Sequence, residues 1–272
     1  MGLLQSRTRV AMILISFLLI GLWFDSLTMI MLPLFTMFLG VMGVREYHRM
    51  ARNSGAVFSF PLLGLITAIV IFFGTVENSE FVRAMPVLLA GVMILIYAVQ
   101  MKRYGIPGAL IGTACAGFSL MYIALPLSLT LQVLRLDKLF LLFGLVLIWS
   151  ADSGAYFVGM RFGKHKMAPN LSPKKTIEGF FGGVAACSIV AVLFGVIAPP
   201  DVFPYRWYHV MLLGAAVGGI APLGDLAESV LKRDTGVKDS GRGMGGHGGI
   251  LDRIDSMLFC MPVYYVYLFF IA

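Results

Sequence analysis

The chain has 272 residues, of which 59% are hydrophobic and only 13% are charged, and its mean hydropathy is +0.89. This composition excludes an ordinary soluble domain, whose charged fraction is about twice as large. The net charge of +7 does not indicate nucleic-acid binding, because the basic residues lie in short connections beside long apolar runs, where they meet anionic lipid headgroups. We therefore expect an integral membrane protein that contacts membrane lipids and no nucleic acid.

The apolar runs have the length of membrane-spanning helices. They are about 15 to 22 residues long and show no strand-type alternation, which fits helices that cross about 30 Å of hydrocarbon. The sequence predicts an all-α, polytopic transmembrane bundle of about nine spans, with a retained first helix and no signal-peptide cleavage site. The predicted spans are 10–24, 27–44, 56–76, 84–100, 107–126, 139–158, 176–198, 207–223 and 250–272.

The basic residues also predict the orientation of these spans. Of the 21 Lys and Arg residues, 17 fall at the N-terminus or in every second connection, and four fall on the opposite side. Positive residues favour the cytoplasmic side of a membrane. We therefore expect a multi-pass protein of the inner (cytoplasmic) membrane with its N-terminus in the cytoplasm. The two most polar connections, before residues 176 and 250, then face the cytoplasm.

Polar residues are unevenly distributed along the chain. Residues 1–148 contain few charges within the predicted spans and are expected to form a transmembrane scaffold, whereas residues 149–272 are expected to carry the chemistry. Cys115, Cys187 and Cys260 lie singly in predicted spans without metal-ligand spacing, so we assign them no chemical role.

The first polar motif, residues 149–156, places Asp152 and two serines inside an apolar helix. Gly159 and Gly163 follow at a spacing that allows close helix contact. Asp152 is either a buried side chain that joins two helices or a carboxylate that faces a polar cavity.

The second motif, residues 171–179, resembles a phosphate-binding helix start. Ser172 is a suitable N-cap and Pro173 suits the first helical position. Free N–H groups there attract anions, and Lys174 and Lys175 add full positive charges. The alternative is that the two lysines only mark the cytoplasmic end of a span.

The third motif, residues 224–256, contains two carboxylate pairs at a spacing of three residues. Asp225 and Glu228 share a helix face with Ser229 and Lys232, and Asp252 and Asp255 repeat the spacing at the start of the last helix. Carboxylate oxygens without Cys or paired His favour Mg²⁺, or alternatively Mn²⁺, over zinc, and one or two ions could bind. A Mg²⁺ site usually includes substrate phosphates, so this pattern predicts phosphoryl-group chemistry.

Between the two pairs, residues 241–249 include six glycines together with Arg242, Met244 and His247. Such a loop can bring backbone N–H groups close to a bound anion. His247 is a phosphate donor, a proton carrier or only a turn residue. The alternative for the whole stretch is a solvated loop with salt bridges.

These motifs together resemble the phosphatidate cytidylyltransferase family, also called CDP-diacylglycerol synthases. The resemblance rests on residues 229–233, 238–241 and 247–255, with support from the motifs around Asp152, Ser172 and Asp225. It departs from the family pattern at residues 242–246. The resemblance implies a Mg²⁺-dependent nucleotidyltransferase of phospholipid biosynthesis. It also implies CTP and phosphatidate as substrates and a second copy of the chain as the partner in a homodimer.

The resemblance also implies roles for individual residues. Asp225 and Asp252 are expected to be the principal metal ligands, with Asp152, Glu228 and Asp255 as further ligands or supporting partners. The residues expected to act on the reacting phosphates are Lys174, Lys175, Lys232, Lys238, His247 and Arg253. The residues expected to bind the nucleotide are Ser172, Thr176, Arg233, Asp239, Gly248 and Gly249.

Three other functions are compatible with parts of the sequence. The same transfer to a different lipid phosphate, such as an ether lipid, is not distinguished by any residue. A CDP-alcohol phosphotransferase would carry a DG-x2-AR motif, which is absent. An ion-coupled transporter would use intramembrane carboxylates but would not need the motif at residues 172–176 or the glycine loop.

Overall fold

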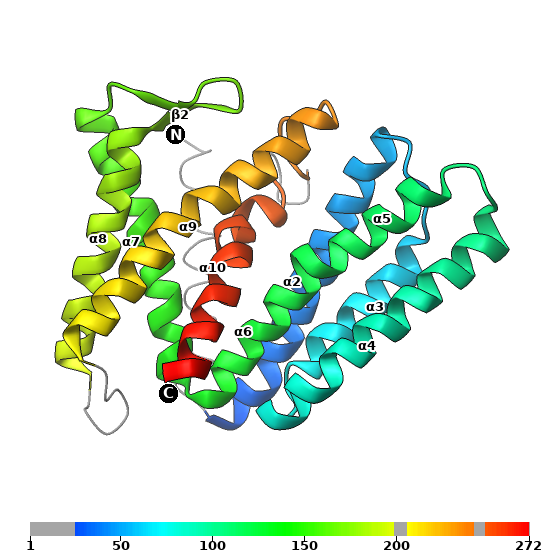
Figure 1. Ribbon diagram of the computed structural model, residues 1–272, viewed down its shortest axis with the longest axis horizontal. Coiled ribbons are helices and arrows are strands. Elements are labelled where there is room, and N and C mark those ends of the chain that lie inside the picture. Colours follow the sequence, from blue (N-terminus) through cyan, green and yellow to red (C-terminus); the bar gives the residue numbers. More distant parts are fainter. Residues whose placement is uncertain (1–24, 199–205, 242–247, 272) are drawn as a thin grey trace. The chain divides into compact units, whose positions relative to one another are not determined.

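The structure, a computed structural model, describes residues 25–198, 206–241 and 248–271. Figure 1 shows that these residues form helices, apart from one short hairpin, which confirms the all-α prediction. The predicted span 10–24 lies outside the described residues. The helices are α2 (Asp25–Asn53), α3 (Phe60–Phe73), α4 (Asn78–Val99), η1 (Gln100–Tyr104), α5 (Ala109–Ser119), η2 (Leu120–Ala124), α6 (Leu125–Leu136), α7 (Lys138–Phe162), α8 (Ile177–Ile197), α9 (Trp207–Asp234) and α10 (Leu251–Ile271), and the strands are β1 (Lys166–Ala168) and β2 (Ser172–Thr176).

Within the described part of the chain, six helical segments are long and apolar enough to cross a membrane. They are Thr28–Asn53, Asn78–Tyr104, Ala109–Leu136, Lys138–Phe162, Ile177–Ile197 and Trp207–Asp234. These segments are typical of a multi-pass membrane protein, because each covers the hydrocarbon thickness at 1.5 Å per residue. The total of nine spans and the side of the N-terminus stay predictions.

Several helices extend beyond their predicted ends. The span expected to end at Pro126 continues to Leu136, and a π-helical turn, η2, ends two residues before this proline. Proline has no backbone N–H group and so cannot donate the hydrogen bond of a regular α-helix. A π-helical turn accommodates such a local break in the bonding pattern. The span expected to end at Leu223 continues to Asp234, so Asp225 lies within α9 and not at its end.

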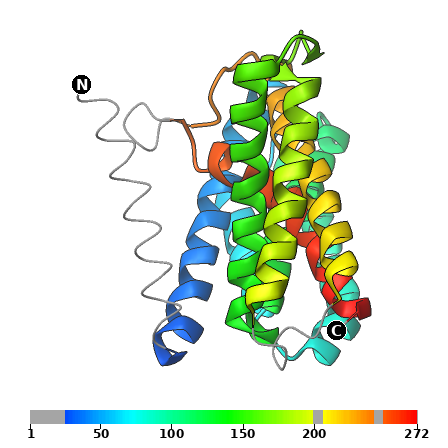
Figure 2. The same ribbon diagram turned by 90° about the vertical axis from the view of Figure 1, so that its left-hand side faces the viewer.

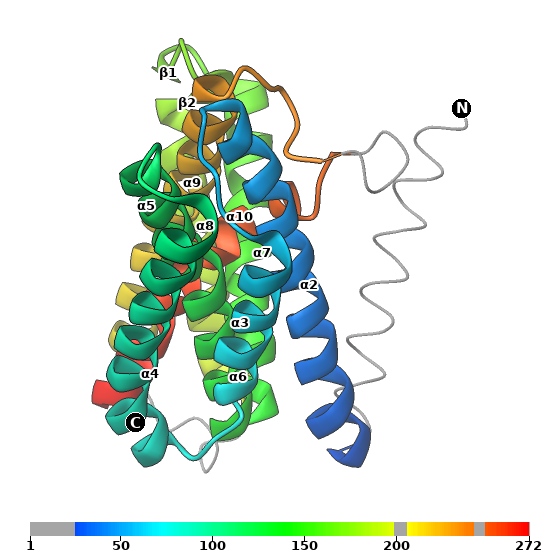
Figure 3. The same cartoon turned by 90° about the vertical axis from the view of Figure 1, so that its right-hand side faces the viewer.

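The chain forms two compact units. One unit contains residues 1–131 and 239–250, and the other contains residues 132–238 and 251–272. In the first unit, α2 packs beside α3 (Figure 3), and the buried side chains include Leu63, Ile66, Ile71 and Leu127. The predicted functional division after residue 148 stays a prediction.

Small residues allow α7, α8, α9 and α10 to pack closely in the second unit. A Cβ atom added to Gly183 in α8 would lie 2.8 Å from the Ala151 carbonyl oxygen in α7. A Cβ atom on Gly224 in α9 would lie 2.9 Å from Ser256 Cα in α10. Such close approach is typical of helix contacts in membranes. Figure 2 shows α7 and α8 side by side, with the hairpin at one end of the pair.

Candidate functional site

A cavity of about 550 Å³ lies in the second unit, among α7, the hairpin, α8, α9 and α10. Its volume is in the range of small-molecule sites, which measure about 300–1,000 Å³. The lining residues are Asp152, Ala155, Tyr156, Gly159, Met160, Met167, Ser172, Lys174, Lys175, Thr176, Gly179, Phe180, Pro222, Asp225, Asp252, Asp255 and Ser256.

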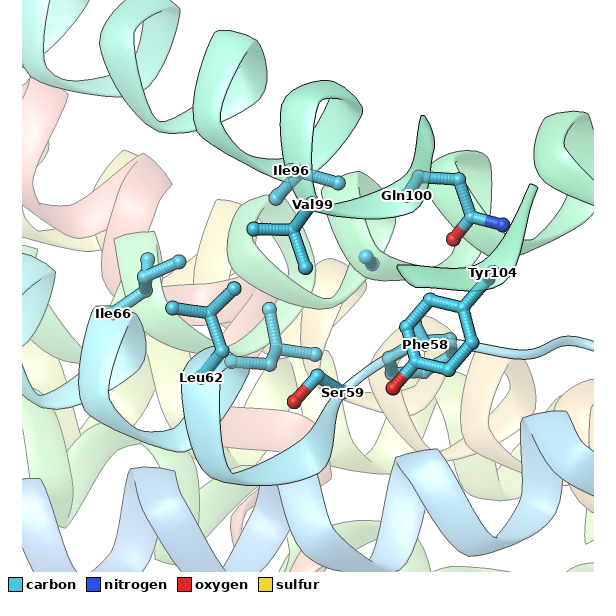
Figure 4. Close-up of a pocket in the computed structure, with 10 residues that line it drawn as sticks. Phe58, Ser59, Leu62, Ile66, Ile96, Val99, Gln100 and Tyr104 are labelled. Atoms are coloured by element: carbon cyan, nitrogen blue, oxygen red, sulfur yellow. The ribbon is translucent and has the colours of Figure 1, made fainter. Parts of the chain in front are cut away.

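A second cavity, in the first unit, is unsuited to a large substrate. Figure 4 shows Leu62 and Ile66 of α3 near Val99 of α4, with Gln100 and Tyr104 close by. The cavity measures about 20 Å³, which is room for about one water molecule. The 550 Å³ cavity is therefore the candidate functional site.

Four of the five carboxylates predicted to bind metal line this cavity. Asp152 comes from α7, Asp225 from α9, and Asp252 and Asp255 from the start of α10. Asp152 and Asp255 each interact electrostatically with Asp225. The Asp152 side chain opens on the cavity and is not a buried link between two helices.

Lys175 places a positive charge against this acidic group. Its Nζ atom lies 2.9 Å from an Asp225 carboxylate oxygen and donates a hydrogen bond of 2.9 Å to the Pro222 carbonyl oxygen. Lys174, on the same strand, is exposed and also lines the cavity. Both lysines predicted to bind phosphate thus lie at the same cavity as the carboxylates.

The prediction of Ser172 as a helix N-cap is wrong. Residues Ser172–Thr176 form β2, which pairs with β1 in an antiparallel hairpin with a register irregularity, and Pro173 is not in a helix. The N-cap of α8 is Thr176, whose Oγ1 accepts a hydrogen bond of 3.1 Å from the Gly179 N–H. Pairing with β1 keeps the Ser-Pro segment extended, so the helix begins at Ile177. The helix start still lies at the cavity, because Thr176 and Gly179 line it.

Glu178 joins the hairpin to the first turn of α8. Its carboxylate accepts hydrogen bonds from the backbone N–H groups of Lys164 and His165, at 3.1 Å and 3.2 Å. It also contacts His165 Nδ1 at 2.6 Å. These contacts hold the hairpin at the helix N-terminus, where Lys174 and Lys175 reach the cavity.

A buried ion-pair cluster lies beside the cavity. Lys232 Nζ donates to Glu228 at 2.7 Å and to Asp252 at 2.6 Å. Glu228 is 1% exposed and does not line the cavity, which favours a supporting role over direct metal binding. Its Oε1 atom has no hydrogen-bond partner among the described residues. The expected helix-face contact between Asp225 and Ser229 also forms, at 3.4 Å.

Six other predicted site residues are not among those that line the cavity. Arg233, Lys238 and Arg253 are exposed. Asp239, Gly248 and Gly249 belong to the other compact unit, and Gly248 has a φ of +83°, which favours glycine. His247 lies outside the described residues.

Glu46, a buried carboxylate in α2, was not among the residues predicted from the sequence. Its two oxygens accept hydrogen bonds from Ser240 Oγ and from the Ile250 N–H. The only feature of the sequence that pointed to this residue is that it is a glutamate near the end of a long apolar run. Its partners are about 200 residues away and could not be identified from the sequence.

The carboxylates of the cavity fit a Mg²⁺ ion whose remaining ligands are water and substrate phosphates. No group of three or more His, Cys, Asp or Glu side chains in the described residues has the geometry of a complete metal site. Mg²⁺, however, is usually bound through only one or two carboxylates together with water and substrate phosphates. Asp152, Asp225 and Asp255 supply carboxylate oxygens around one open volume, which fits that kind of site.

Comparisons with known proteins give consistent results. Residues 5–271 match the model of the cytidylyltransferase family. A phosphatidate cytidylyltransferase of Brucella suis is 32% identical over 271 residues, covering 98% of this chain and 94% of the relative. A phosphatidate cytidylyltransferase of Staphylococcus epidermidis is 34% identical over 241 residues, covering 86% and 88%. One of Bacillus subtilis is 43% identical over 148 residues, and this match spans about half of each protein, 53% of the chain and 54% of the relative.

Proposed function

The chain belongs to the cytidylyltransferase family, and from this premise we propose that it transfers the cytidylyl group of CTP to phosphatidate, giving CDP-diacylglycerol and pyrophosphate. Relatives named phosphatidate cytidylyltransferase, two of which cover most of the chain, support this substrate pair. The observation that carries the proposal is the single cavity in which four carboxylates and two lysines meet.

The lining of the cavity suits a lipid phosphate as well as a nucleotide. Tyr156, Met160 and Phe180 provide apolar surface beside the charged residues, and Tyr156 and Met160 are 63% and 67% exposed. Phosphatidate needs both kinds of contact, because its acyl chains stay in the bilayer while its phosphate must reach CTP.

In the proposed reaction, a phosphatidate oxygen attacks the α-phosphorus of CTP. The new P–O bond forms as the bond to the bridging oxygen of the β-phosphate breaks, and pyrophosphate leaves with that electron pair. Both reactants are anions, so positioning and charge neutralisation supply the catalysis. Lys174 and Lys175 would bind the reacting phosphates, and no covalent enzyme intermediate is required.

The Lys175 and Asp225 pair has a further part in this proposal. In the structure the two charges neutralise each other at 2.9 Å. An entering phosphate competes with Asp225 for Lys175, which leaves the carboxylate available to a cation. We propose Mg²⁺ as that cation, held by Asp225 with Asp152, Asp255 or Asp252, where it would neutralise charge on the phosphates.

The cytoplasmic side is the proposed location of the cavity, because CTP is a cytoplasmic nucleotide. Most Lys and Arg residues also fall in one set of alternate connections, which are expected to face that side. A homodimer is the proposed assembly, on the strength of the family resemblance. Cross-linking in native membranes measures the assembly directly, and a monomer under those conditions would contradict it.

The test of the function is release of pyrophosphate by the purified protein in lipid-containing micelles. We expect release only with CTP, phosphatidate and Mg²⁺ together, and loss of release when the metal is chelated. Replacement of phosphatidate by an ether-lipid phosphate tests the alternative acceptor. A folded protein that releases no pyrophosphate with the complete mixture would contradict the proposal.

The site is tested with Asp225→Asn, which keeps the side-chain volume but removes the charge. We expect a fall in kcat of about 100-fold or more, as for loss of a group that stabilises transition-state charge. Asp234→Asn, at the exposed end of the same helix, is the matched control and should keep wild-type activity. Equal activity of the two variants would show that the charge of Asp225 is not needed for the reaction.

A further inference from the structure

Glu178 anchors the hairpin to the first turn of α8. Its carboxylate accepts hydrogen bonds from the backbone N–H groups of Lys164 at 3.1 Å and His165 at 3.2 Å, and it contacts His165 Nδ1 at 2.6 Å. In return, the Ile177 N–H donates a hydrogen bond of 2.9 Å to the His165 carbonyl oxygen. The connection between α7 and β1 is therefore bound to the helix start through both its N–H groups and a carbonyl group.

The hairpin needs such an anchor because it is short. β1 has three residues and β2 has five, and their register is irregular between Lys166 and Ala168. A two-stranded hairpin by itself is at best marginally stable in water. β1 directly follows the anchored connection, at the end of the α7 and α8 pair in Figure 2. The Glu178 contacts therefore fix where β1 begins and, through strand pairing, where β2 lies.

The two lysines of β2 differ in what holds their side chains. The Lys175 side chain is 20% exposed, and its Nζ atom contacts Asp225 and the Pro222 carbonyl oxygen, both at 2.9 Å. Lys174 lines the same cavity but is exposed, and its side chain makes no hydrogen bond or ion pair within residues 25–198, 206–241 and 248–271. The placement of Lys174 at the cavity therefore depends on the position of its backbone in β2.

We propose that Glu178 is a positioning residue that acts through Lys174 on a substrate phosphate. This inference rests on the proposed function, in which Lys174 binds one of the reacting phosphates. Glu178 fixes the connection before β1, β1 fixes β2 by pairing, and β2 presents Lys174 to the cavity. Glu178 is not among the residues that line the cavity and is not proposed to touch a substrate.

This linkage predicts that Glu178 and Lys174 affect the binding of the same substrate. A lysine on a fixed strand binds an anion with little loss of conformational freedom, whereas a lysine on a released hairpin must be ordered on binding. Loss of the anchor should therefore raise the KM of the substrate whose phosphate Lys174 binds and leave the other KM unchanged. A purely structural role would instead reduce the amount of folded enzyme, which lowers apparent kcat and leaves both KM values unchanged.

A double-mutant cycle, with KM measured for both CTP and phosphatidate, tests the proposal. We expect Lys174→Ala to raise one of the two KM values about tenfold, as for loss of one charge-assisted hydrogen bond. Glu178→Ala should raise the KM of the same substrate about three- to tenfold. The double variant should exceed Lys174→Ala by no more than about twofold, because the lysine through which Glu178 acts is already absent. Two independent residues would instead multiply their effects, to about 30-fold or more.

Milder variants and a matched control accompany this cycle. His165→Ala removes the ring contact and keeps both backbone hydrogen bonds, so it should have a smaller effect than Glu178→Ala and serves if that variant does not fold. Glu178→Gln should stay within about threefold of wild type, because its amide oxygen accepts from the backbone N–H groups and its NH2 group can donate to Nδ1 of a neutral imidazole. Glu80→Ala is the control, because it also removes a carboxylate from the first turn of a helix, and both KM values should stay unchanged.

Hydrogen exchange of the hairpin tests the anchor without relying on activity. In Glu178→Ala the backbone amides of residues 163–176 should exchange about tenfold faster than in wild type, because the carboxylate that binds two of them is lost and the strands are released. Exchange in α9 and α10 should stay unchanged, which separates release of the hairpin from general unfolding. Glu80→Ala should leave exchange of the hairpin at the wild-type rate.

The outcomes separate this proposal from the proposed function. Unchanged KM values in Glu178→Ala, a fall in apparent kcat alone, or multiplied effects in the double variant overturn the positioning role. Hairpin exchange that does not rise in Glu178→Ala overturns the anchor itself. If the folded wild-type protein releases no pyrophosphate, the role of Glu178 in substrate binding fails with the proposed function, while faster hairpin exchange in Glu178→Ala still supports the anchor.

Discussion

Lys232 joins a buried and a partly buried acidic side chain in the second unit. Its ammonium group contacts Glu228 and Asp252 at 2.7 Å and 2.6 Å, and Glu228 is almost completely removed from solvent. Burying an ionised carboxylate without a partner is costly, so the cation must balance at least one of the two charges.

Substitution of Lys232 should therefore destabilise the protein. We expect Lys232→Met to lower the free energy of unfolding by about 3–5 kcal/mol, as for removal of one partner from a buried ion pair. Denaturant unfolding in detergent, followed by helical circular dichroism, measures the change. Adding Glu228→Gln to the same protein should recover part of the loss, because it removes one uncompensated charge.

A control for this experiment is Lys166→Met, at an exposed position of β1. A surface substitution of this kind should change the free energy of unfolding by no more than about 0.5 kcal/mol. A similar small change for Lys232→Met would show that the ion-pair cluster does not contribute to stability.

At the scale of secondary-structure elements, the hairpin and the start of α8 form one assembly. β1 pairs with β2, Thr176 ends the strand and caps the helix, and Glu178 in the first helical turn binds back to the chain between α7 and β1. This arrangement places two lysines of an extended strand, and the N-terminus of a helix, at one cavity.

The helix start is tested by comparing Thr176→Val with Ser172→Ala. Thr176→Val keeps the shape but loses the hydrogen bond to the Gly179 N–H, so it should lower the free energy of unfolding by about 1 kcal/mol. Ser172→Ala should lower it by less than about 0.5 kcal/mol, since Ser172 does not cap the helix. Denaturant unfolding in detergent measures both variants. A larger loss of free energy of unfolding for Ser172→Ala than for Thr176→Val would indicate that Ser172 is the N-cap.

The same elements show which parts of the site could be predicted from the sequence. Spacing within a helix is fixed by its period, so the contacts of Asp225 with Ser229 and of Glu228 with Lys232 followed directly from residue numbers. Ser172 and Pro173 carry a local preference for a helix start, but pairing with β1 is a contact of the folded chain and overrode it. The hydrogen bonds of Glu46 are to partners 194 and 204 residues away, which no local pattern contains.

At the scale of the whole molecule, the distribution of basic residues predicts which connections face the cytoplasm. Arg83, Arg135, Lys138 and Arg206 are expected on the far side of the membrane and the other 17 Lys and Arg residues on the cytoplasmic side. The proposed use of CTP requires the same orientation, because the nucleotide must reach Lys174 and Lys175.

Labelling of single cysteines in sealed membrane vesicles tests this orientation. In a chain whose three native cysteines are replaced by alanine, Lys164→Cys should react with an impermeant thiol reagent from the cytoplasmic face only. Arg83→Cys should react from the opposite face only, and both positions are exposed. Labelling of Lys164→Cys from the far face would contradict both the orientation and the access of CTP to the cavity.

The bond between Glu46 and Ser240 also has a consequence for biosynthesis. The two residues are 194 positions apart, and a ribosome adds about 5–20 residues per second, so about 10–40 s pass between their syntheses. During membrane insertion, the α2 carboxylate is therefore present long before the groups that bind it have been made. The first unit can be completed only after most of the second unit has been synthesised. Completion of the first unit is therefore a late step of biosynthesis.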